Sequence, residues 1–347
     1  MDTRQAIEIK TLDDAAHPRW DAFVAAFPDA TFFHRAGWKT VLERAFGHEA
    51  PFLYAERAGR IIGVLPLGRI KSAVFGHALI STPFCVYGGA AAVEPDAIHA
   101  LEQAACELAA GQGVDYLELR HIVPRHPDWP RKEELYVTFR KALDPDPDKN
   151  LLAIPRKQRA MVRKGIQAGL RSDVDDGVER VYEAYSISVR NLGTPVFSKA
   201  YFQTLKDVFG DDCECLVVSR GGRLVAGVMN FYFRDQVLPY YGGGTDEARA
   251  VKGNDFMYWE VMRRAVLRGV RVFDYGRSKV GTGSYSFKKN WGFEPAPLVY
   301  EYQLVKAREV PDINPLNPKY RLFINTWKRL PLGLTRLLGP HIVKYLG

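Results

Sequence analysis

The strongest constraint on the fold of this 347-residue chain is an internal repeat. The segment Trp38–Gly47 ends in Phe-Gly, and so does Tyr201–Gly210, whose Phe-Gly pair lies 163 residues further along. The same separation relates Gly59 to Gly222, each of which stands at a turn between two apolar stretches. Because motifs that recur in order at a fixed spacing are typical of duplicated units, the sequence predicts two copies of one fold.

The repeat continues beyond these turns. Tyr87–Gly89 corresponds to Tyr241–Gly243, and Glu118 corresponds to Asp274. In each copy we expect a helix that ends at Phe-Gly, then a β-hairpin whose glycine supplies the positive φ of a tight turn, then a third strand that ends at Tyr-Gly-Gly. A second helix should follow, and after it a short apolar strand with the acidic residue near its carboxyl end.

The second helix of each copy is predicted from apolar residues that recur at three and four positions. They are Leu101, Ala104, Ala105 and Leu108 in the first copy and Phe256, Trp259, Met262 and Val266 in the second. Both helices should stop at a glycine, namely Gly111 or Gly113 and Gly269. This order of elements resembles one half of a GNAT-type acyltransferase. We therefore expect an α/β fold of two tandem GNAT-like domains with mixed sheets.

Length and composition fit this organisation. A chain of this length, with 47% hydrophobic residues, can form two cores of roughly 150 residues each. An Asp-Pro-Asp-Pro-Asp run predicts a linker between them. We expect a first domain at 1–142, a linker at 143–150, a second domain with a basic amino-terminal helix at 151–310, and a basic amphipathic helical tail at 311–347.

The sequence also predicts the environment of the protein. The amino terminus lacks the apolar core of a signal peptide, and the uncharged stretch 78–93 is shorter than the roughly 20 residues of a spanning helix. We expect a cytoplasmic protein. Neither the four cysteines nor the eight histidines have the spacing of a metal site, so we expect reduced structural thiols and no metal. The net charge of +8 favours an anionic partner.

Three further patterns carry a resemblance to a known family. Phe273–Ser278 has the sequence Phe-Asp-Tyr-Gly-Arg-Ser, and Phe287–Phe293 has the sequence Phe-Lys-Lys-Asn-Trp-Gly-Phe. The predicted helix Arg156–Arg171 contains six basic residues and no acid. Together with the duplication, these patterns make residues 30–305 resemble the FemAB family, and more narrowly the FemAB-like proteins associated with exosortase/PEP-CTERM and exopolysaccharide gene sets.

FemAB transferases move an aminoacyl group from an aminoacyl-tRNA to an amine of a peptidoglycan precursor. The resemblance therefore implies an N-acyltransferase with no bound cofactor, a donor that is an aminoacyl-tRNA or an acyl-CoA, and an anionic or lipid-linked peptidoglycan or exopolysaccharide precursor as acceptor. By position, Phe287 and Lys288 match a Phe-Lys pair close to the acyl-transfer centre of the family. Arg190 resembles the arginine that holds a phosphate of the acceptor. The lysine that several members carry after the first-domain tryptophan has only Lys39 as a counterpart, so acceptor recognition is expected to differ.

The chemistry of acyl transfer assigns roles to these residues. The reaction needs a neutral amine and stabilisation of the oxyanion of the tetrahedral intermediate. The Lys288 ammonium suits the oxyanion, with Phe287 packed beneath it, and the alternative is a solvated lysine beside Lys289. Asp274, at the carboxyl end of a strand, suits the amine, which it would orient or deprotonate, and the alternative is a salt bridge to Arg277.

Other residues are candidates for binding a substrate. Arg277 is a candidate anion contact near Gly281–Gly283. The pattern Arg277-x-x-x-Gly281-x-Gly283 is one residue longer than the acetyl-CoA loop pattern of GNAT enzymes, so it is weak evidence for coenzyme A. Tyr241 suits the wall of a substrate cleft, although strand tyrosines commonly pack in cores. A polyanion such as tRNA would be attracted by the basic helix, whose alternative role is a solvated helix face. Its candidate residues are Arg156, Arg159, Arg163 and Lys164.

The tail at 311–347 contains one acidic residue against six Lys and Arg residues, interleaved with Trp and Leu. Such a segment lies peripherally in an anionic membrane interface or docks on the domains.

Two functions compete with the aminoacyl or acyl transfer that the family resemblance implies. One is an acyl-CoA-dependent N-acetyltransferase with a small acceptor. The other is a non-catalytic module that binds RNA or lipid headgroups.

Overall fold

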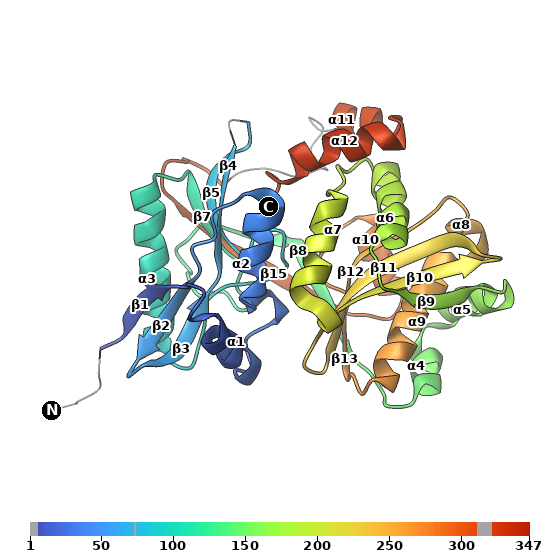
Figure 1. The fold of residues 1–347 in the computed structure, drawn as a ribbon, viewed down its shortest axis with the longest axis horizontal. Coiled ribbons are helices and arrows are strands. Elements are labelled where there is room, and N and C mark those ends of the chain that lie inside the picture. Colours follow the sequence, from blue (N-terminus) through green and yellow to red (C-terminus); the bar gives the residue numbers. More distant parts are fainter. Residues whose placement is uncertain (1–5, 73, 311–320) are drawn as a thin grey trace. The chain divides into compact units, whose positions relative to one another are not determined.

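The computed structural model describes residues 6–72, 74–310 and 321–347. Its chain divides into two compact units (Figure 1). Unit 1 comprises Met1–Tyr136, Pro297–Asp312 and Tyr345–Gly347, and unit 2 comprises Val137–Ala296 and Ile313–Lys344. Both units combine helices with β-sheet, which confirms the predicted α/β class.

Unit 1 contains two groups of strands and the helices α1 (His17–Ala26), α2 (Gly37–Val41) and α3 (Pro95–Gln112). One sheet has the order β1-β2-β3-β6, with β1 at Glu8–Thr11, β2 at Leu53–Arg57, β3 at Arg60–Leu65 and β6 at Ala91–Ala92. The other strands lie in the order β4 (Leu67–Ser72), β5 (Gly76–Ser81), β7 (Tyr116–Leu119) and β15 (Pro295–Leu304). The core includes Leu101 and Ala105 of α3, as the apolar spacing predicts.

Unit 2 is built on a sheet with the strand order β8-β13-β12-β11-β10-β9. These strands are β8 (Arg131–Ala142), β9 (Arg171–Asp175), β10 (Cys213–Arg220), β11 (Arg223–Phe233), β12 (Gln236–Gly244) and β13 (Val272–Asp274), and β14 (Ser278–Lys279) pairs with β8. The helices are α4 (Pro147–Ala153), α5 (Arg156–Gln167), α6 (Glu179–Leu192), α7 (Lys199–Phe209), α8 (Ala248–Val251), α9 (Gly253–Leu267), α10 (Gly283–Asn290), α11 (Arg321–Trp327) and α12 (Leu332–Val343).

The first part of the repeat has the predicted structure in both units. A helical segment ends at Phe46 and another at Phe209, each followed by a glycine with positive φ. The hairpin β2–β3 then turns at Ala58 and Gly59, with φ values of 52° and 74°, and β10–β11 turns at Gly221 and Gly222, with φ values of 54° and 78°. Two successive positive φ values characterise the type I′ turn that matches the twist of a hairpin.

The strand pairing in the second part of the repeat is also the same in both units. Strand β7 is parallel to β5, and β13 is parallel to β12. The preceding helices α3 and α9 are followed by Gly113 and Gly269, with φ values of 59° and 83°, which confirms the predicted glycine stops. The acidic residues Glu118 and Asp274 lie near the carboxyl ends of β7 and β13.

The prediction of a third strand that ends at Tyr-Gly-Gly is correct for unit 2 and wrong for unit 1. Strand β12 contains Tyr241–Gly243, but β5 ends at Ser81, before Tyr87–Gly89. Thr82 and Phe84 have positive φ, and Pro83 between them cannot donate to a strand ladder, so the strand stops there. The backbone N–H groups of Gly88 and Gly89 instead donate to the carbonyl of Arg120.

The glycine run in β12 allows helices to approach both faces of the sheet in unit 2. A Cβ atom at Gly243 would lie 2.7 Å from the carbonyl oxygen of Ala184 on α6, whereas one at Gly242 would lie 3.0 Å from the hydroxyl of Tyr258 on α9. Successive residues of a strand point to opposite faces, so α6 and α9 cover opposite sides of β12. The glycines are therefore explained by close packing.

The chain does not change unit at the expected positions. Residues 137–142, the second half of β8, belong to unit 2, and the last three of them pair with β13. Most of β15 belongs to unit 1 and pairs with β7. The expected linker at 143–150 includes the first turn of α4, because Asp146 caps that helix and Pro147 occupies its first position. In the tail, residues 311–320 lie outside the described residues, and α11 and α12 belong to unit 2.

Within the residues described, no helix combines the length and the apolar character that a membrane-spanning helix requires.

Candidate acyl-transfer site

The candidate site begins at the turn after β13. Asp274 is buried, and its Oδ1 accepts a hydrogen bond of 2.8 Å from the backbone N–H of Gly276. Gly276 has a φ of 65°, which glycine adopts without strain. An aspartate that accepts from the residue two positions ahead fixes the turn in one conformation. The Oδ2 atom of Asp274 lies 3.4 Å from Nε of Arg140 on β8, so Asp274 forms a salt bridge with Arg140.

Lys288 of α10 lies against this turn. Its Nζ donates hydrogen bonds to the carbonyl oxygens of Tyr275, Gly276 and Arg277, at 2.7, 3.0 and 3.1 Å. An ammonium has three N–H donors, and each has an acceptor here. This geometry argues against the solvated lysine that the sequence left open, whereas the neighbouring Lys289 is exposed.

The surroundings of Lys288 shift its proton affinity. The pKa of Lys288 is lowered from 10.5 to about 7, chiefly because burial disfavours the charged form; the charge of Asp274 raises this pKa and that of Arg277 lowers it, both by less than burial does. The Nζ atom also lies 5.6 Å from the ring centre of Phe139 and 5.7 Å from that of Tyr275. A group whose pKa is near neutrality can both carry a charge and transfer a proton at physiological pH.

Phe287 packs beside this site in an aromatic cluster. Its ring centre lies 5.6 Å from that of Tyr258 and 6.1 Å from that of Trp291. Tyr258, on α9, is in turn 4.9 Å from Tyr275 in an edge-to-face contact. The cluster supports the turn that holds Lys288. The hydroxyl of Tyr275 is buried without a hydrogen-bond partner among the described residues.

The loop between Arg277 and Lys288 is a helix cap. Thr282 is the N-cap of α10, because its Oγ1 accepts from the backbone N–H of Tyr285, and the same hydroxyl donates to the carbonyl of Lys279. Helix α10 therefore begins at Gly283. The carbonyl of Arg277 is one of the three acceptors of Lys288, so Arg277 belongs to the site at least through its backbone.

Tyr241 lies in a different cluster. Its hydroxyl is 2.7 Å from that of Tyr201 on α7, and its ring contacts Tyr185, Phe197 and Phe202. The side chain is only 7% exposed. This environment matches the core-packing alternative for a strand tyrosine, and the structure does not support a cleft wall at this position.

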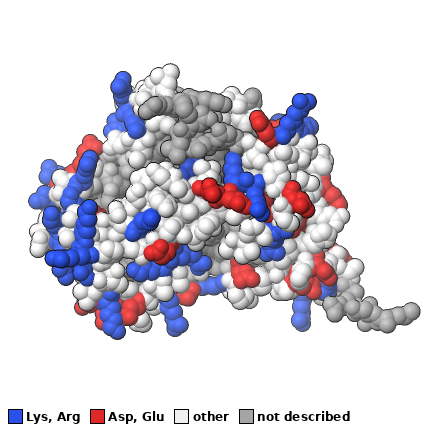
Figure 2. All heavy atoms as spheres, turned by 180° about the vertical axis from the view of Figure 1, so that it is seen from behind, with Lys and Arg blue, Asp and Glu red and all other residues white. Residues whose placement is uncertain are grey.

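The basic helix is α5, and most of its predicted residues face solvent. Arg156, Arg163 and Lys164 are exposed, because the helix packs on α9 through Val162 and Gly165. Figure 2, which views the molecule from behind, shows Lys and Arg side chains gathered on the side where α5 lies. Arg159 differs from the others, since it is half-buried and its Nη1 donates to the carbonyl of Leu152 at 2.6 Å.

Arg190, the candidate phosphate ligand, lies in the last turn of α6. Its side chain is half-buried, and its Nε is buried without a hydrogen-bond partner among the described residues. A buried guanidinium N–H without an acceptor is costly, so an anionic group that accepts from it would be bound favourably.

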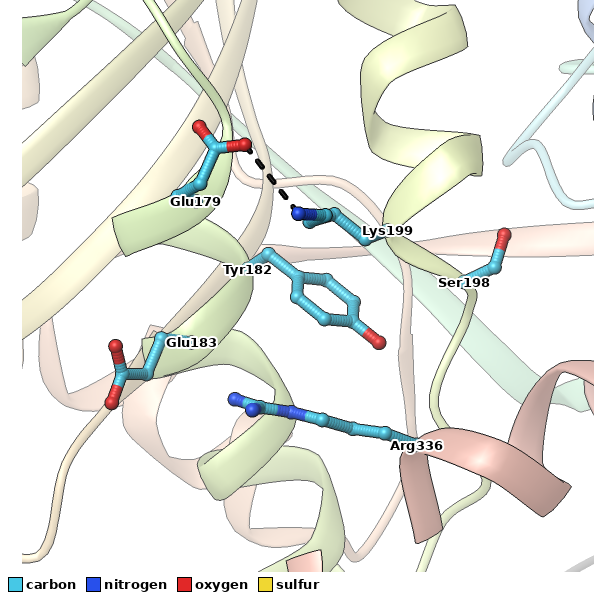
Figure 3. A pocket seen from close by; sticks show the side chains of 6 residues that line it. All are labelled: Glu179, Tyr182, Glu183, Ser198, Lys199 and Arg336. Carbon is cyan, nitrogen blue, oxygen red and sulfur yellow. Dashed lines mark ion pairs between the residues drawn. The ribbon is translucent and has the colours of Figure 1, made fainter. Parts of the chain in front are cut away.

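A separate pocket of about 430 Å³ lies where α6, α7 and α12 meet (Figure 3). It combines carboxylates with cations and one aromatic ring, and its lining residues are Glu179, Tyr182, Glu183, Ser198, Lys199 and Arg336. Lys199 Nζ lies 3.6 Å from Glu179, and the guanidinium of Arg336 lies 5.3 Å from the ring centre of Tyr182. None of these residues was predicted from sequence, because the pocket exists only after the tail helix packs on α6.

The matching acidic residue of unit 1, Glu118, is paired with an arginine. There Glu118 forms a buried salt bridge with Arg120, whose Nε lies 2.6 Å from Glu118 Oε1. The same guanidinium donates to the carbonyl of Cys85 and lies over the ring of Tyr300. Because arginine keeps its proton at any physiological pH, Arg120 cannot deliver one to a substrate.

The four cysteines are buried or half-buried. In the described structure none of these cysteines forms a disulfide, and burial raises the pKa of Cys215 to about 11, which disfavours its reactive thiolate. Among the residues that the structure describes, no group of three or more His, Cys, Asp and Glu side chains is arranged to hold a metal ion.

The chain resembles known proteins in sequence over one segment and in structure over most of its length. Residues 156–289, which include Lys288, match the family model described as an acetyltransferase (GNAT) domain. The full chain resembles the crystal structure of FemX, with a TM-score of 0.67 at 17% identity over 91% of this chain and 100% of that one. The fold is a tandem GNAT-like fold. None of the curated proteins matches the chain in sequence.

Two further solved structures share this tandem GNAT-like fold. One is a tandem GNAT protein from the clavulanic acid biosynthesis pathway, with a TM-score of 0.53 at 15% identity over 88% of this chain and 100% of that one. Another is the C-terminal domain of a putative lysylphosphatidylglycerol synthetase from Agrobacterium fabrum, with a TM-score of 0.56 at 13% identity over 83% of this chain and 92% of that one. The domain match and the fold support acyl transfer as the general reaction.

Proposed function

We propose that this chain is an N-acyltransferase that moves an acyl or aminoacyl group to an amine, with its chemistry in unit 2. The observation that carries the proposal is the position of Lys288, which lies inside the segment that matches a GNAT domain and has a pKa of about 7. Its Nζ is fixed by three backbone carbonyls of one turn. A fixed cation with a pKa near neutrality suits both charge stabilisation and proton transfer.

In the proposed step, the neutral amine of the acceptor attacks the carbonyl carbon of the donor. An N–C bond forms, and the C–O bond of an aminoacyl ester or the C–S bond of an acyl-CoA breaks. The Lys288 ammonium stabilises the negative charge on the carbonyl oxygen and gives a proton to the leaving oxygen or sulfur. It regains a proton from the new amide nitrogen. Since all three N–H groups bind carbonyls in the structure, the ammonium must exchange one carbonyl for the substrate.

Asp274 has a positioning role in this proposal. It is 1% exposed, and its carboxylate holds the N–H of Gly276, so it shapes the turn that presents the three carbonyls. Phe287 contributes through the aromatic cluster that supports Tyr275. Both residues act through the placement of Lys288.

For the donor, we propose an aminoacyl-tRNA whose phosphates lie along the exposed cations of α5, here Arg156, Arg163 and Lys164. The likeness to FemX, together with the FemAB-like sequence patterns, favours this donor. The likeness to a tandem GNAT protein favours acyl-CoA as the second candidate. For the acceptor, we propose an anionic or lipid-linked precursor of peptidoglycan or of an exopolysaccharide, with Arg190 at a phosphate. We also propose that the protein is associated with exosortase/PEP-CTERM systems.

The test is steady-state kinetics with charged tRNA and with acetyl-CoA, against a panel of lipid-linked amine-bearing precursors. Lys288→Ala should lower kcat by roughly 100-fold or more, the usual effect of losing one such contact. Lys289→Ala is the matched control, because Lys289 is the adjacent but exposed lysine, and it should change kcat little. Lys288→Arg keeps a positive charge but does not release a proton near neutral pH, so it should lose the proton transfer and have a lower kcat than the wild type.

Three outcomes would count against the proposal. If Lys288→Ala had the same kcat and KM as the wild type, the role of Lys288 would be structural. A change confined to KM that weakens at high ionic strength would show that Lys288 binds an anionic part of the acceptor. No turnover with either donor, combined with tight salt-sensitive RNA binding, would favour a non-catalytic module.

A further inference from the structure

The tail helices of unit 2 have a second apolar face that is exposed. On α12, Leu334, Leu337 and Leu338 are 39%, 65% and 41% exposed, and their spacing of three and four residues places them on one side of the helix. On α11, Leu322 and Phe323 are 78% and 40% exposed. Apolar side chains grouped in this way commonly mark a contact surface, unlike scattered exposed leucines.

The opposite side of α12 explains how the helix is attached. Thr335, Gly339 and Val343 are buried at intervals of four residues. A Cβ atom at Gly339 would lie 2.7 Å from the carbonyl oxygen of Val196, so glycine permits this close approach. Arg336, seen in Figure 3, reaches α6, where its Nε and Nη2 donate to Oγ of Ser186 at 3.0 and 2.7 Å. The exposed leucines are therefore not needed to hold the helix in place.

The charge of the segment is complementary to an anionic partner. From residue 313 to residue 347 the sequence contains no Asp or Glu and six Lys and Arg residues. Lys328 and Arg329, between α11 and α12, are both exposed. Lysine and arginine beside exposed leucine and phenylalanine are the composition of helices that lie in the plane of an anionic bilayer interface.

We propose that α11 and α12 form a membrane-docking surface for anionic phospholipid bilayers. The apolar side chains Leu322, Phe323, Leu334, Leu337 and Leu338 enter the boundary between headgroups and acyl chains, while Lys328 and Arg329 lie at the lipid phosphates. The contact is peripheral, and it would hold unit 2 at a surface where lipid-linked molecules are concentrated. The inference does not depend on the proposed reaction, because binding to vesicles requires no substrate.

The test is cosedimentation of the full-length protein with vesicles of phosphatidylcholine and phosphatidylglycerol, compared with vesicles of phosphatidylcholine alone. The wild type should bind the anionic vesicles more tightly. The double variant Leu334→Ser/Leu337→Ser should reduce the partition coefficient by about tenfold or more, since each leucine loses its transfer to an apolar environment. Lys328→Ala/Arg329→Ala should reduce it by roughly 30-fold at low salt, and by less at high salt.

Leu267→Ser is the matched control, because Leu267 on α9 is 67% exposed but lies outside the tail. It should bind as the wild type does. Circular dichroism spectra of all variants should match, because the substituted side chains are exposed. The proposal is overturned if the wild type does not bind anionic vesicles, or if Leu334→Ser/Leu337→Ser binds as tightly as the wild type. If Leu334→Ser/Leu337→Ser still bound and only Lys328→Ala/Arg329→Ala lost binding, the partner of the basic tail would be a polyanion such as RNA.

Discussion

The altered pKa of Lys288 predicts how the stability of unit 2 responds to pH, and this can be measured without a substrate. The drop of the pKa from 10.5 to about 7 means that the folded site disfavours the ammonium by roughly 5 kcal/mol relative to water. Between about pH 7 and pH 10.5, Lys288 is protonated in the unfolded chain and neutral in the folded chain, so the unfolded chain binds one more proton. Stability due to this group should therefore rise with pH above 7, by up to about 1.4 kcal/mol per pH unit.

The comparison is between the wild type and Lys288→Met, which keeps a long side chain without a charge. From pH 7.5 to pH 9.0, the free energy of unfolding of the wild type minus that of the variant should rise by about 2 kcal/mol. Urea unfolding followed by tryptophan fluorescence gives both free energies. Lys289→Met removes an exposed lysine, and its difference from the wild type should stay constant.

A pH-independent difference for Lys288→Met would refute this reasoning. It would mean that the three carbonyl acceptors keep the ammonium charged in the folded state, so that their hydrogen bonds outweigh the cost of burial. Lys288 would then carry a permanent charge, and it could still stabilise an oxyanion but could not deliver a proton at neutral pH.

Other predictions concern packing and the basic helix. Gly243→Ala should destabilise unit 2 by about 1–3 kcal/mol in urea unfolding, since its Cβ would lie 2.7 Å from the Ala184 carbonyl, and equal stability would contradict the close approach of α6 to β12. Tyr241→Phe should cost about 1–3 kcal/mol because it removes the hydrogen bond between the buried hydroxyls of Tyr241 and Tyr201, and the double change with Tyr201→Phe should cost less than the sum of the two single changes. Arg163→Ala/Lys164→Ala should weaken tRNA binding and reduce the slope of log affinity against log salt by up to about 2, and an unchanged slope would place tRNA elsewhere.

The duplication has not left two equivalent sites. The acidic residue of unit 2, Asp274, shapes a turn that holds a titratable lysine, whereas Glu118 in unit 1 is neutralised by a buried arginine. Our expectation that Phe46-Gly47 superposes on Phe209-Gly210, and Glu118 on Asp274, stays a prediction for a direct superposition of the two units.

Much of the fold could be predicted because local features are determined by local sequence. Gly59 and Gly222 predicted the hairpin turns, because the positive φ of such a turn is costly for most other residues. Gly113 and Gly269 predicted the ends of helices for the same reason. Amphipathic spacing in α3 and α9 predicted which residues enter the cores. The local prediction failed at Tyr87–Gly89, where two residues with positive φ on either side of Pro83 end the strand.

The character of the candidate site was decided by tertiary structure. The family resemblance suggested Phe287 and Lys288, and the carboxyl end of a strand suggested Asp274, but the sequence left open whether Lys288 was solvated. Only the folding of α10 against the turn after β13 gives Nζ its three carbonyl acceptors and removes it from water. The pocket of Arg336 and Tyr182, and the core position of Tyr241, likewise depend on helices far apart in the chain. Burial and pKa arise from contacts between distant segments, and a local sequence pattern does not record those contacts.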